Sequence, residues 1–289
     1  MQQTGSADYG YLRELVYGLS QNVLDPSRDY LFETRLSKVL RNQGMSHLGQ
    51  LVSHLRAARN PTLERAVAEA MTINETSFFR DTRPFELLRT ELLPKIIEAR
   101  RMQRSLRIWS AACSTGQEPY SLAMMMKDHF PILAGWRVEI VATDLSPTVL
   151  DRAREGIYST FEVQRGLPIQ MLIRHFDQIE PNWQIKRELR RTVNFRPLNL
   201  LEDFAVLGQF DIVLCRNVLI YFDQPTKTRI LNGITRRIAP DGAVMLGGAE
   251  SVFGLCDGLA GVPGLKGVYS HAKSSKSPIL STLPLSAAS

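Results

Sequence analysis

Cysteine and long apolar runs are both scarce in this chain. The three cysteines Cys113, Cys215 and Cys256 are far apart and odd in number, which argues against a disulfide framework and predicts a reducing, cytoplasmic setting. No apolar run approaches the roughly 20 residues that cross a bilayer. The first ten residues lack the basic and apolar regions of a signal peptide. We therefore expect neither a secreted protein nor one inserted in a membrane.

Catalytic and metal-binding signatures are missing too. The five histidines form no cluster, and the sequence has no HExxH, CxxC or GxSxG motif, so we expect no metal site and no nucleophile mechanism. Adenine-N6 methyltransferases carry a [DN]PP[YF] motif that holds a flipped base, whereas this chain reads RNVLIYF at 216–222. The net charge of +6 favours an acidic partner, but we expect no nucleic acid.

Strand and helix patterns alternate over the second half of the chain. Short apolar runs predict strands at 106–112, 138–143, 192–197, 210–215 and 243–246, with a further late strand at 267–271. Runs without alternation, such as DIVLC at 211–215, are typical of strands buried on both faces of a parallel sheet. Helices are expected near 118–130, 147–154 and 225–238. This alternation predicts a doubly wound α/β domain.

The segments outside this alternating pattern predict an N-terminal group of helices, a linker helix and a small subdomain. Residues 11–70 are rich in helix formers with turn signals between them, which predicts three or four short helices after a frayed segment at 1–10. A linker helix kinked at Pro94 is expected from Arg83 to Met102. Residues 155–192 interrupt the alternation and predict a protruding subdomain with a basic surface.

The turn within WSAACSTGQEPYSLAM (109–124) lies where an open parallel sheet binds its ligands. Its one glycine, Gly116, does not make the G-x-G-x-x-G pattern of a dinucleotide site, which argues against a nicotinamide dehydrogenase. Glu118 would repel a phosphate and attract a cation. S-adenosylmethionine (SAM) combines a nucleoside with a sulfonium and an ammonium, so this acid favours SAM. A capping box of Thr115 and Glu118, with Pro119 in the first turn, is the alternative.

Further candidate residues follow the later strands. Asp144 ends the predicted second strand, where a carboxylate can accept hydrogen bonds from a ribose diol. A helix cap at Asp144 or Ser146 is the alternative. Asn199-Leu200 follows the third strand and Arg216-Asn217 follows the fourth. Ordinary turn chemistry is the alternative for the two asparagines.

Five motifs occur in an order that resembles one enzyme family. They are INETSFFRD (73–81), AACSTGQEPYSLAM (111–124), ATDLS (142–146), NLLE (199–202) and RNVLIYFD (216–223). Between about residues 10 and 270, the chain is similar to CheR-type chemotaxis receptor glutamate O-methyltransferases. The resemblance implies a Rossmann-like SAM-dependent methyltransferase domain with a small β-subdomain insertion, preceded by a small all-α N-terminal domain.

The resemblance also implies the domain boundaries. They are a helical substrate-recognition domain at 1–72, a cofactor-covering segment and linker helix at 73–104, and the α/β domain at 105–272 with its β-subdomain at about 155–192. Residues 273–289 are rich in Ser and Pro, and this composition predicts a disordered tail.

Individual residues acquire roles from the same resemblance. SAM, and its product S-adenosylhomocysteine, would be bound by Asn74, Thr76, Arg80, Glu118, Asp144, Asn199, Leu200, Arg216 and Asn217. Tyr221 would lie beside the transferred methyl group as the catalytic residue, with a core aromatic as the alternative. For 73–81 the alternative is an ordinary helix start after Asn74, with Phe78 and Phe79 in the core.

The implied substrate is a glutamate on an acidic cytoplasmic helix of a methyl-accepting chemotaxis receptor. Glutamate is ionised at neutral pH because its ordinary pKa is about 4.3, so methyl transfer needs no general base. A basic stripe at helix-compatible spacing would attract this helix; it consists of Arg28, Arg35, Lys38 and Arg41. A solvated helix face is the alternative.

The sequence departs from the family pattern in two places. The first leaves the expected cofactor site unchanged, and the second concerns only the docking of a receptor peptide. Gln117 stands where many relatives have a second acid, but Glu118 is in place. The segment 175–189 has no glycine, whereas some relatives dock a receptor's C-terminal peptide on a glycine-containing loop there. We therefore expect direct receptor recognition. The alternative function is a non-catalytic SAM- or S-adenosylhomocysteine-binding regulator of a chemosensory pathway; the presence of Glu118, Asp144 and Tyr221 favours the enzyme.

Overall fold

The computed structural model describes residues 4–272, so the predicted tail at 273–289 lies outside the described residues. The chain divides into two compact units. Unit 1 comprises Met1–Ile73 with Tyr221–Thr226, and unit 2 comprises Asn74–Ile220 with Lys227–Ser289. Within residues 4–272, no helix is both long enough and apolar enough to cross a membrane.

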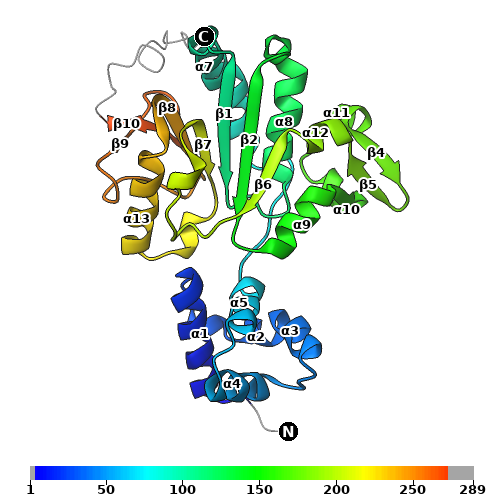
Figure 1. Ribbon diagram of the computed structural model, residues 1–289, viewed down its shortest axis with the longest axis vertical. Coiled ribbons are helices and arrows are strands. Elements are labelled where there is room, and N and C mark those ends of the chain that lie inside the picture. Colours follow the sequence, from blue (N-terminus) through cyan, green and yellow to red (C-terminus); the bar gives the residue numbers. More distant parts are fainter. Residues whose placement is uncertain (1–3, 273–289) are drawn as a thin grey trace. The chain divides into compact units, whose positions relative to one another are not determined.

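Unit 1 consists of short helices around one apolar core (Figure 1). They are α1 (Ser6–Ser20), the 3-10 helix η1 (Pro26–Arg28), α2 (Tyr30–Arg35), α3 (Ser37–Asn42), α4 (Leu48–Ala57) and α5 (Pro61–Ala70). The helices meet through buried side chains, among them Leu12, Val16, Phe32, Leu40, Leu51 and Val67. Asn60 caps α5 by accepting a hydrogen bond from the Leu63 N–H, and Pro61 occupies the first helical position.

Two expectations for unit 1 are wrong. The N-terminal segment is not frayed throughout, because α1 already begins at Ser6 and packs its apolar side into the core. The basic stripe does not lie on one helix either. Arg28 belongs to η1, and a break at Leu36 separates α2 from α3. Arg35 is half-buried and donates a hydrogen bond to the carbonyl oxygen of Met71 at 3.0 Å, so it secures the end of α5.

A seven-stranded sheet forms the centre of unit 2, in the order β6-β2-β1-β7-β8-β10-β9 (Figure 1). Its strands are β1 (Ser105–Ala111), β2 (Arg137–Asp144), β6 (Val193–Pro197), β7 (Phe210–Cys215), β8 (Ile238–Leu246), β9 (Leu259–Gly261) and β10 (Val268–His271). Neighbouring strands are parallel from β6 to β8, and β10 runs antiparallel to both β8 and β9. The predicted doubly wound α/β fold is confirmed.

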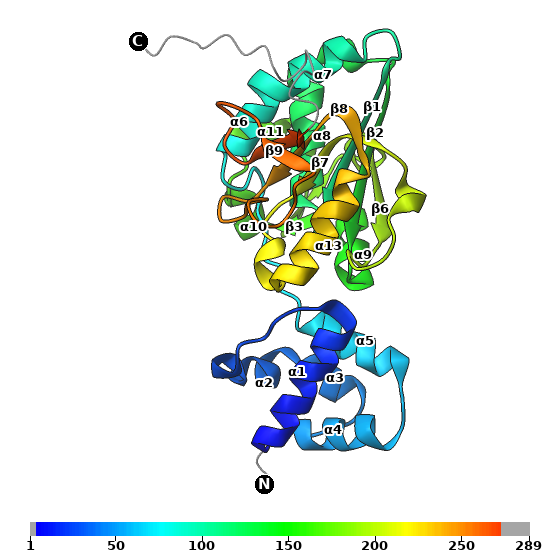
Figure 2. The same ribbon diagram turned by 90° about the vertical axis from the view of Figure 1, so that its left-hand side faces the viewer.

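Apolar residues cover both faces of the sheet because side chains alternate along each strand. Ile108 joins the cluster formed with α8 (Gln117–His129), while its neighbour Trp109 faces the other way and contacts Phe204, with ring centroids 5.3 Å apart. On the Trp109 face, Gly233 of α13 (Gln224–Thr235) lies against Phe204 so closely that a Cβ would come within 2.4 Å of that ring. Figure 2 shows α13 in front of the sheet. The helix α9 (Pro147–Glu155) packs against β2 and β6.

The predicted kinked helix precedes the sheet. It consists of α6 (Arg83–Leu87), a π-helical turn η2 (Leu88–Leu92) and α7 (Leu93–Ala99). The regular helix is interrupted by this π turn, which ends two residues before Pro94, a residue with no N–H to donate. Arg100 follows α7 and ties this helix to the sheet, because its guanidinium pairs with Asp211 of β7 at 2.7 Å and Asp241 of β8 at 2.5 Å.

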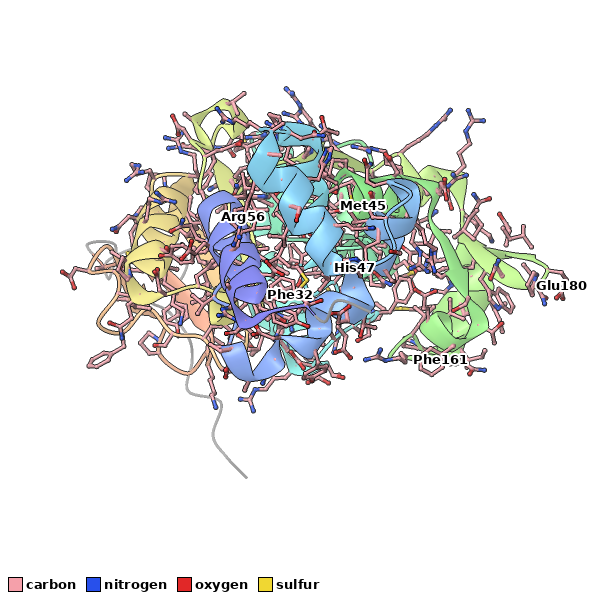
Figure 3. The ribbon with its side chains drawn as sticks, turned by 90° about the horizontal axis from the view of Figure 1, so that it is seen from below. Phe32, Met45, His47, Arg56, Phe161 and Glu180 are labelled. Atoms are coloured by element: carbon pink, nitrogen blue, oxygen red, sulfur yellow. The ribbon has the colours of Figure 1, made fainter. Side chains whose placement is uncertain are left out.

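Residues 155–192 form a small subdomain next to β6 (Figure 1). Its antiparallel sheet has the order β3-β5-β4, with bounds Ile157–Ser159, Asn182–Ile185 and Phe176–Ile179. The short helices α10 (Thr160–Gln164), α11 (Ile169–His175) and α12 (Arg187–Arg190) complete it. Figure 3 shows Phe161 and Glu180 at its outer edge. Besides η1, the described residues contain the 3-10 turns η3 (Pro131–Leu133), η4 (Ala205–Leu207) and η5 (Leu219–Tyr221).

Candidate cofactor site

The carboxyl ends of the parallel strands β1, β2 and β7 meet at one edge of the sheet, where open α/β folds bind ligands. The backbone there is unusual. Left-handed φ angles occur at Ala112 (57°), Ser114 (51°), Gly116 (93°) and Asn217 (58°). For a residue other than glycine such a conformation costs about 1–3 kcal/mol and persists only where its surroundings enforce it. This edge is therefore held in one defined shape.

Asp144 is placed at the end of β2 and is 7% exposed. Its Oδ2 accepts a hydrogen bond from the Ser114 N–H at 2.8 Å, and its Oδ1 accepts one from the Ser146 N–H at 3.1 Å. Burial raises the pKa of this carboxyl, against the lowering effect of the backbone hydrogen bonds. The N-cap of α9 is Ser146, so the alternative is confirmed for Ser146 and wrong for Asp144. Instead, Asp144 connects β2 to the turn after β1.

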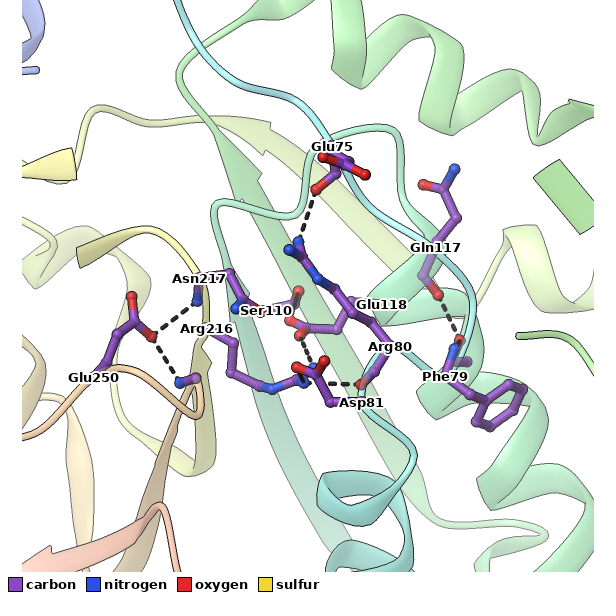
Figure 4. A network of polar contacts seen from close by, with 12 residues as sticks. Glu75, Phe79, Arg80, Asp81, Ser110, Gln117, Glu118, Arg216, Asn217 and Glu250 are labelled. Atoms are coloured by element: carbon purple, nitrogen blue, oxygen red, sulfur yellow. Dashed lines mark hydrogen bonds and ion pairs between the residues drawn. The ribbon is translucent and has the colours of Figure 1, made fainter. Parts of the chain in front are cut away.

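Glu118 lies in the first turn of α8, but it does not cap that helix. The cap is Gly116, and no side chain makes a capping hydrogen bond, so the capping-box alternative is wrong. Glu118 Oε1 accepts from the Ser110 hydroxyl at 2.7 Å, and Oε2 pairs with Arg216 Nη1 at 2.9 Å (Figure 4). The charge of Glu118 therefore already has a cationic partner within this chain, which the sequence analysis does not anticipate.

Arg216 joins the end of β7 to the segment 73–81. Its side chain is 1% exposed, and its Nη2 donates to the Arg80 carbonyl and to the Asp81 carboxylate, both at 2.9 Å (Figure 4). Its Nε–H is buried without a partner among residues 4–272. A second link is made by Ser114, whose hydroxyl donates to the Asn74 carbonyl at 2.8 Å. The segment 73–81 is thus fastened to the sheet edge at both of its ends.

This segment is not the ordinary helix start that was the alternative. Phe79, Asp81 and Thr82 have left-handed φ angles of 47°, 68° and 45°, and the Phe79 N–H donates to the Ser121 hydroxyl at 2.9 Å. The expectation that Phe78 is a core residue is confirmed, because it is fully buried.

The subdomain supports the same segment. The Phe78 ring contacts those of Tyr158 and Phe176, with centroids 5.0 and 5.6 Å away. Gly166 approaches the Phe78 carbonyl so closely that a Cβ would come within 2.1 Å of its oxygen, and Arg165 pairs with Glu75 at 3.1 Å. Residues 155–192 therefore contribute to the shape of the candidate site without being part of the sheet.

Glu250 is a functional candidate that the sequence analysis missed. It follows β8, is 9% exposed, and accepts four backbone N–H groups at 2.7–2.9 Å. The donors are Asn217, Val218, Leu219 and Gly247, and Figure 4 shows the contact with Asn217. This carboxylate therefore fixes the loop that begins at the end of β7. The signal available in the sequence was an acid shortly after the predicted fifth strand.

The other predicted residues have different surroundings. Asn199 Oδ1 accepts from the Leu201 N–H at 3.1 Å, which is the turn chemistry of the alternative interpretation, and Leu200 is buried. Thr76 is half-buried within the segment 73–81. Tyr221 belongs to unit 1, where its carbonyl accepts from the Val23 N–H at 2.9 Å. Unit 2 thus places six of the predicted residues in three hydrogen-bond networks at the sheet edge: Asn74 with Asp144, Arg80 with Glu118 and Arg216, and Asn217 with Glu250.

A family model described as "CheR methyltransferase, SAM binding domain" matches residues 74–264. The chain belongs to the CheR methyltransferase family. It is 44% identical over 275 residues to Chemotaxis protein methyltransferase 1 of Pseudomonas aeruginosa (93% of this chain, 98% of the relative). It is 41% identical to Chemotaxis protein methyltransferase Cher2 of Pseudomonas putida (93% and 99%), and 42% identical to Chemotaxis protein methyltransferase 1 of Vibrio cholerae (81% and 86%). The predictions of a methyltransferase and of SAM as its cofactor are confirmed.

The residues at the sheet edge fit this cofactor. An ionised carboxylate has about four acceptor positions, and Glu118 uses two of them, for Ser110 and Arg216. It could therefore also accept from an ammonium group. Asp144 ends β2 at the position where related folds hold a ribose. In the part of the chain between residues 4 and 272, no group of three or more His, Cys, Asp or Glu side chains is placed to hold a metal.

Proposed function

We propose that this enzyme transfers the methyl group of SAM to glutamate side chains on acidic cytoplasmic helices of chemoreceptors, forming glutamate methyl esters. The names of its relatives, chemotaxis protein methyltransferases, support this substrate class. The proposed site of action is the cytoplasm. The observation that carries the proposal is the pair of hydrogen-bond networks at the sheet edge, one around Glu118 and one around Asp144, in which the chain itself holds each of the two predicted acids.

The proposed reaction requires no general acid or general base from the protein. Bound SAM supplies a methyl group on a positively charged sulfur, and an ionised glutamate can attack it without a general base. Transfer cancels the positive and negative charges together, so it is favoured where water is excluded. The work left to this chain is to align the two reactants.

Each candidate residue has a proposed part in that alignment. Asp144 accepts hydrogen bonds from the ribose hydroxyls, and Glu118 accepts from the ammonium group. Arg216 keeps Glu118 in position and holds the segment with Asn74, Thr76 and Arg80 over the cofactor. Asn199-Leu200 and Asn217 complete the cofactor contacts. Tyr221 lies beside the methyl group and helps to exclude water.

Receptor recognition is proposed to be direct rather than through a docked C-terminal peptide. The β4–β5 connection is the two-residue turn Glu180-Pro181, with no glycine-containing loop. Arg28, Lys38 and Arg41 are exposed and available to attract an acidic helix. Arg35 is proposed to act mainly through the position of α5, because its guanidinium already donates to the end of that helix.

Methyl transfer is tested with SAM labelled on its methyl group and a purified cytoplasmic fragment of a chemoreceptor. We expect label on the fragment that mild base releases as methanol, because glutamate methyl esters hydrolyse in base whereas N-methyl groups do not. A fragment in which the acceptor glutamates are replaced by alanine should take up no label. Label that resists base, or label on the alanine fragment, would contradict the proposal.

A further inference from the structure

The tyrosine in the middle of β3 joins the subdomain to the turn after β1. The strand begins after Gly156, which ends α9 with a left-handed φ of 63°. Side chains alternate along a strand, so Tyr158 is fully buried while Ile157 and Ser159 on either side of it are half-buried. The Tyr158 hydroxyl donates a hydrogen bond to the Thr115 carbonyl oxygen at 2.7 Å. A residue of the subdomain therefore reaches the turn at which we place the cofactor.

The Thr115 carbonyl requires a donor from outside the adjoining helix. Thr115 stands two residues before α8, and the residue four positions after it is Pro119. In a continuing helix the N–H of that fourth residue would bond to the carbonyl, but proline has no N–H. Thr115 is 7% exposed, and a buried carbonyl without a partner is costly. The Tyr158 hydroxyl supplies the missing donor.

The strand β2 holds the same turn through a second contact. Asp144 accepts from the N–H of Ser114, the residue before Thr115, at 2.8 Å. Ser114 has a left-handed φ angle, which persists only where the surroundings enforce it. The approach of the subdomain also accounts for the one glycine of this turn, because a Cβ on Gly116 would lie 3.2 Å from the Tyr158 hydroxyl oxygen. The shape of the turn thus depends on both β2 and the subdomain.

The ring of Tyr158 contacts the segment 73–81 as well. It lies edge to face with the ring of Phe78, with centroids 5.0 Å apart, and Phe78 also contacts Phe176 of β4. The segment 73–81 is joined to the turn after β1 by the hydrogen bond from Ser114 to Asn74. One side chain of the subdomain therefore contacts two parts of the chain that carry proposed cofactor residues, the turn through its hydroxyl and the segment through its ring.

We propose that Tyr158 is a positioning residue for SAM, and that through it the subdomain sets the affinity of this enzyme for its cofactor. The hydroxyl fixes the Thr115 carbonyl three residues before Glu118, and with it the start of α8 from which Glu118 is proposed to meet the ammonium group. This gives residues 155–192 a part in cofactor binding that needs no docked receptor peptide. The inference rests on the proposed placement of the cofactor at the sheet edge, and no motif indicated Tyr158.

Replacement of tyrosine by phenylalanine tests the hydroxyl and keeps the ring. Tyr120 provides a matched control, because it is also fully buried and its hydroxyl also donates to a main-chain carbonyl at 2.7 Å, that of Ala153 near the end of α9. Burial raises the pKa of both phenols, so each hydroxyl keeps its proton and can donate at neutral pH. The two variants lose the same kind of hydrogen bond, and only in Tyr158→Phe does that bond hold the turn after β1.

Isothermal titration with S-adenosylhomocysteine measures the effect. Tyr158→Phe leaves the Thr115 carbonyl without this donor, and the Kd should rise about five- to tenfold, or about 1–1.4 kcal/mol. Tyr120→Phe should keep the Kd of the unmodified protein, although urea denaturation should show that both variants lose a similar amount of stability. In methyl transfer to the receptor fragment, Tyr158→Phe should raise KM for SAM by the same factor and leave KM for the fragment unchanged.

The outcomes separate this inference from the proposed function. An unchanged Kd in Tyr158→Phe would overturn the inference, because the turn would not depend on the hydroxyl. An equal rise in Tyr158→Phe and Tyr120→Phe would overturn it too, because a general loss of stability would account for the effect. A selective rise in Tyr158→Phe would support it even if no fragment were methylated, in which case only the proposed receptor substrate would fall. If the unmodified protein does not bind S-adenosylhomocysteine, the placement of the cofactor and this inference fall together.

Discussion

Replacement of Glu250 by glutamine tests how the loop after β7 is held. The carboxylate accepts two N–H groups on each oxygen: Asn217 and Gly247 on Oε2, Val218 and Leu219 on Oε1. Glutamine keeps one oxygen and replaces the other by an NH₂ group, which cannot accept from the two N–H groups facing it. Two of the four hydrogen bonds are therefore lost in either orientation of the amide.

The magnitude follows from those two bonds. A hydrogen bond to a charged acceptor contributes about 1.5–3 kcal/mol, so the gross loss is about 3–6 kcal/mol. Water and a shift of the loop recover part of it, and we expect the free energy of unfolding to fall by about 2–4 kcal/mol. The same clamp holds Asn217 in its left-handed conformation (φ 58°). Loss of that geometry should weaken S-adenosylhomocysteine binding by about tenfold or more, or about 1.4 kcal/mol.

Urea denaturation followed by circular dichroism measures the first effect, and isothermal titration with S-adenosylhomocysteine measures the second. Glu86→Gln makes the same chemical change at an exposed position of α6 and should alter neither value. Wild-type stability and affinity in Glu250→Gln would refute the reasoning, because they would mean that the four N–H groups do not depend on this carboxylate.

Three further predictions concern other contacts of unit 2. Arg100→Met leaves two aspartates of β7 and β8 without their guanidinium partner, and should lower the free energy of unfolding by about 2–4 kcal/mol in urea denaturation; no loss would show that these pairs are dispensable. Gly166→Ala puts a Cβ within 2.1 Å of the Phe78 carbonyl oxygen at a φ of +84°. It should lower the free energy of unfolding by about 1–3 kcal/mol or more and weaken S-adenosylhomocysteine binding. An unchanged affinity would show that the contact between the subdomain and the segment 73–81 does not affect cofactor binding. Burial raises the pKa of Asp144, so its charge, and with it S-adenosylhomocysteine affinity, should be lost on acidification at a higher pH than for an ordinary aspartate. In titrations across acidic pH, Asp144→Asn should bind more weakly and without that pH dependence, and an identical pH profile in both proteins would contradict the assignment.

The sheet could be predicted because most of its strands are buried on both faces. In β7 the four residues 212–215 are apolar and buried, and Asp211 is buried too, so an apolar run without alternation sufficed to indicate a parallel strand. The three-residue strand β9 is too short for any pattern to form, and it exists because it pairs with β10. Similarly, α1 begins in a polar stretch at Ser6, and it is stabilised by the packing of Leu12 and Val16, which lie further along the helix.

Part of the candidate site could be predicted from the rule that open parallel sheets bind ligands at the carboxyl ends of their strands. Parallel strands end at one edge, so Asp144 and the residues following β7 could be placed from the sequence alone. The spacing of residues within one motif could not predict hydrogen-bond partners that come from distant segments of the chain. Glu250 lies 33 residues from Asn217 along the chain, and Arg216 meets Glu118 across 98 residues. The sequence therefore pointed to a cationic ligand of Glu118 but not to Arg216, which pairs with the same carboxylate.

The most direct measurement of the central claim is the binding of S-adenosylhomocysteine to the whole protein and to Asp144→Ala. The account predicts one tight site per chain in the unmodified protein and a large loss of affinity in the variant, because Asp144 holds both the turn after β1 and the proposed ribose position. Circular dichroism should show that the variant remains folded. Equal affinity in the two folded proteins, or no binding by the unmodified one, would contradict the placement of the cofactor at this edge of the sheet.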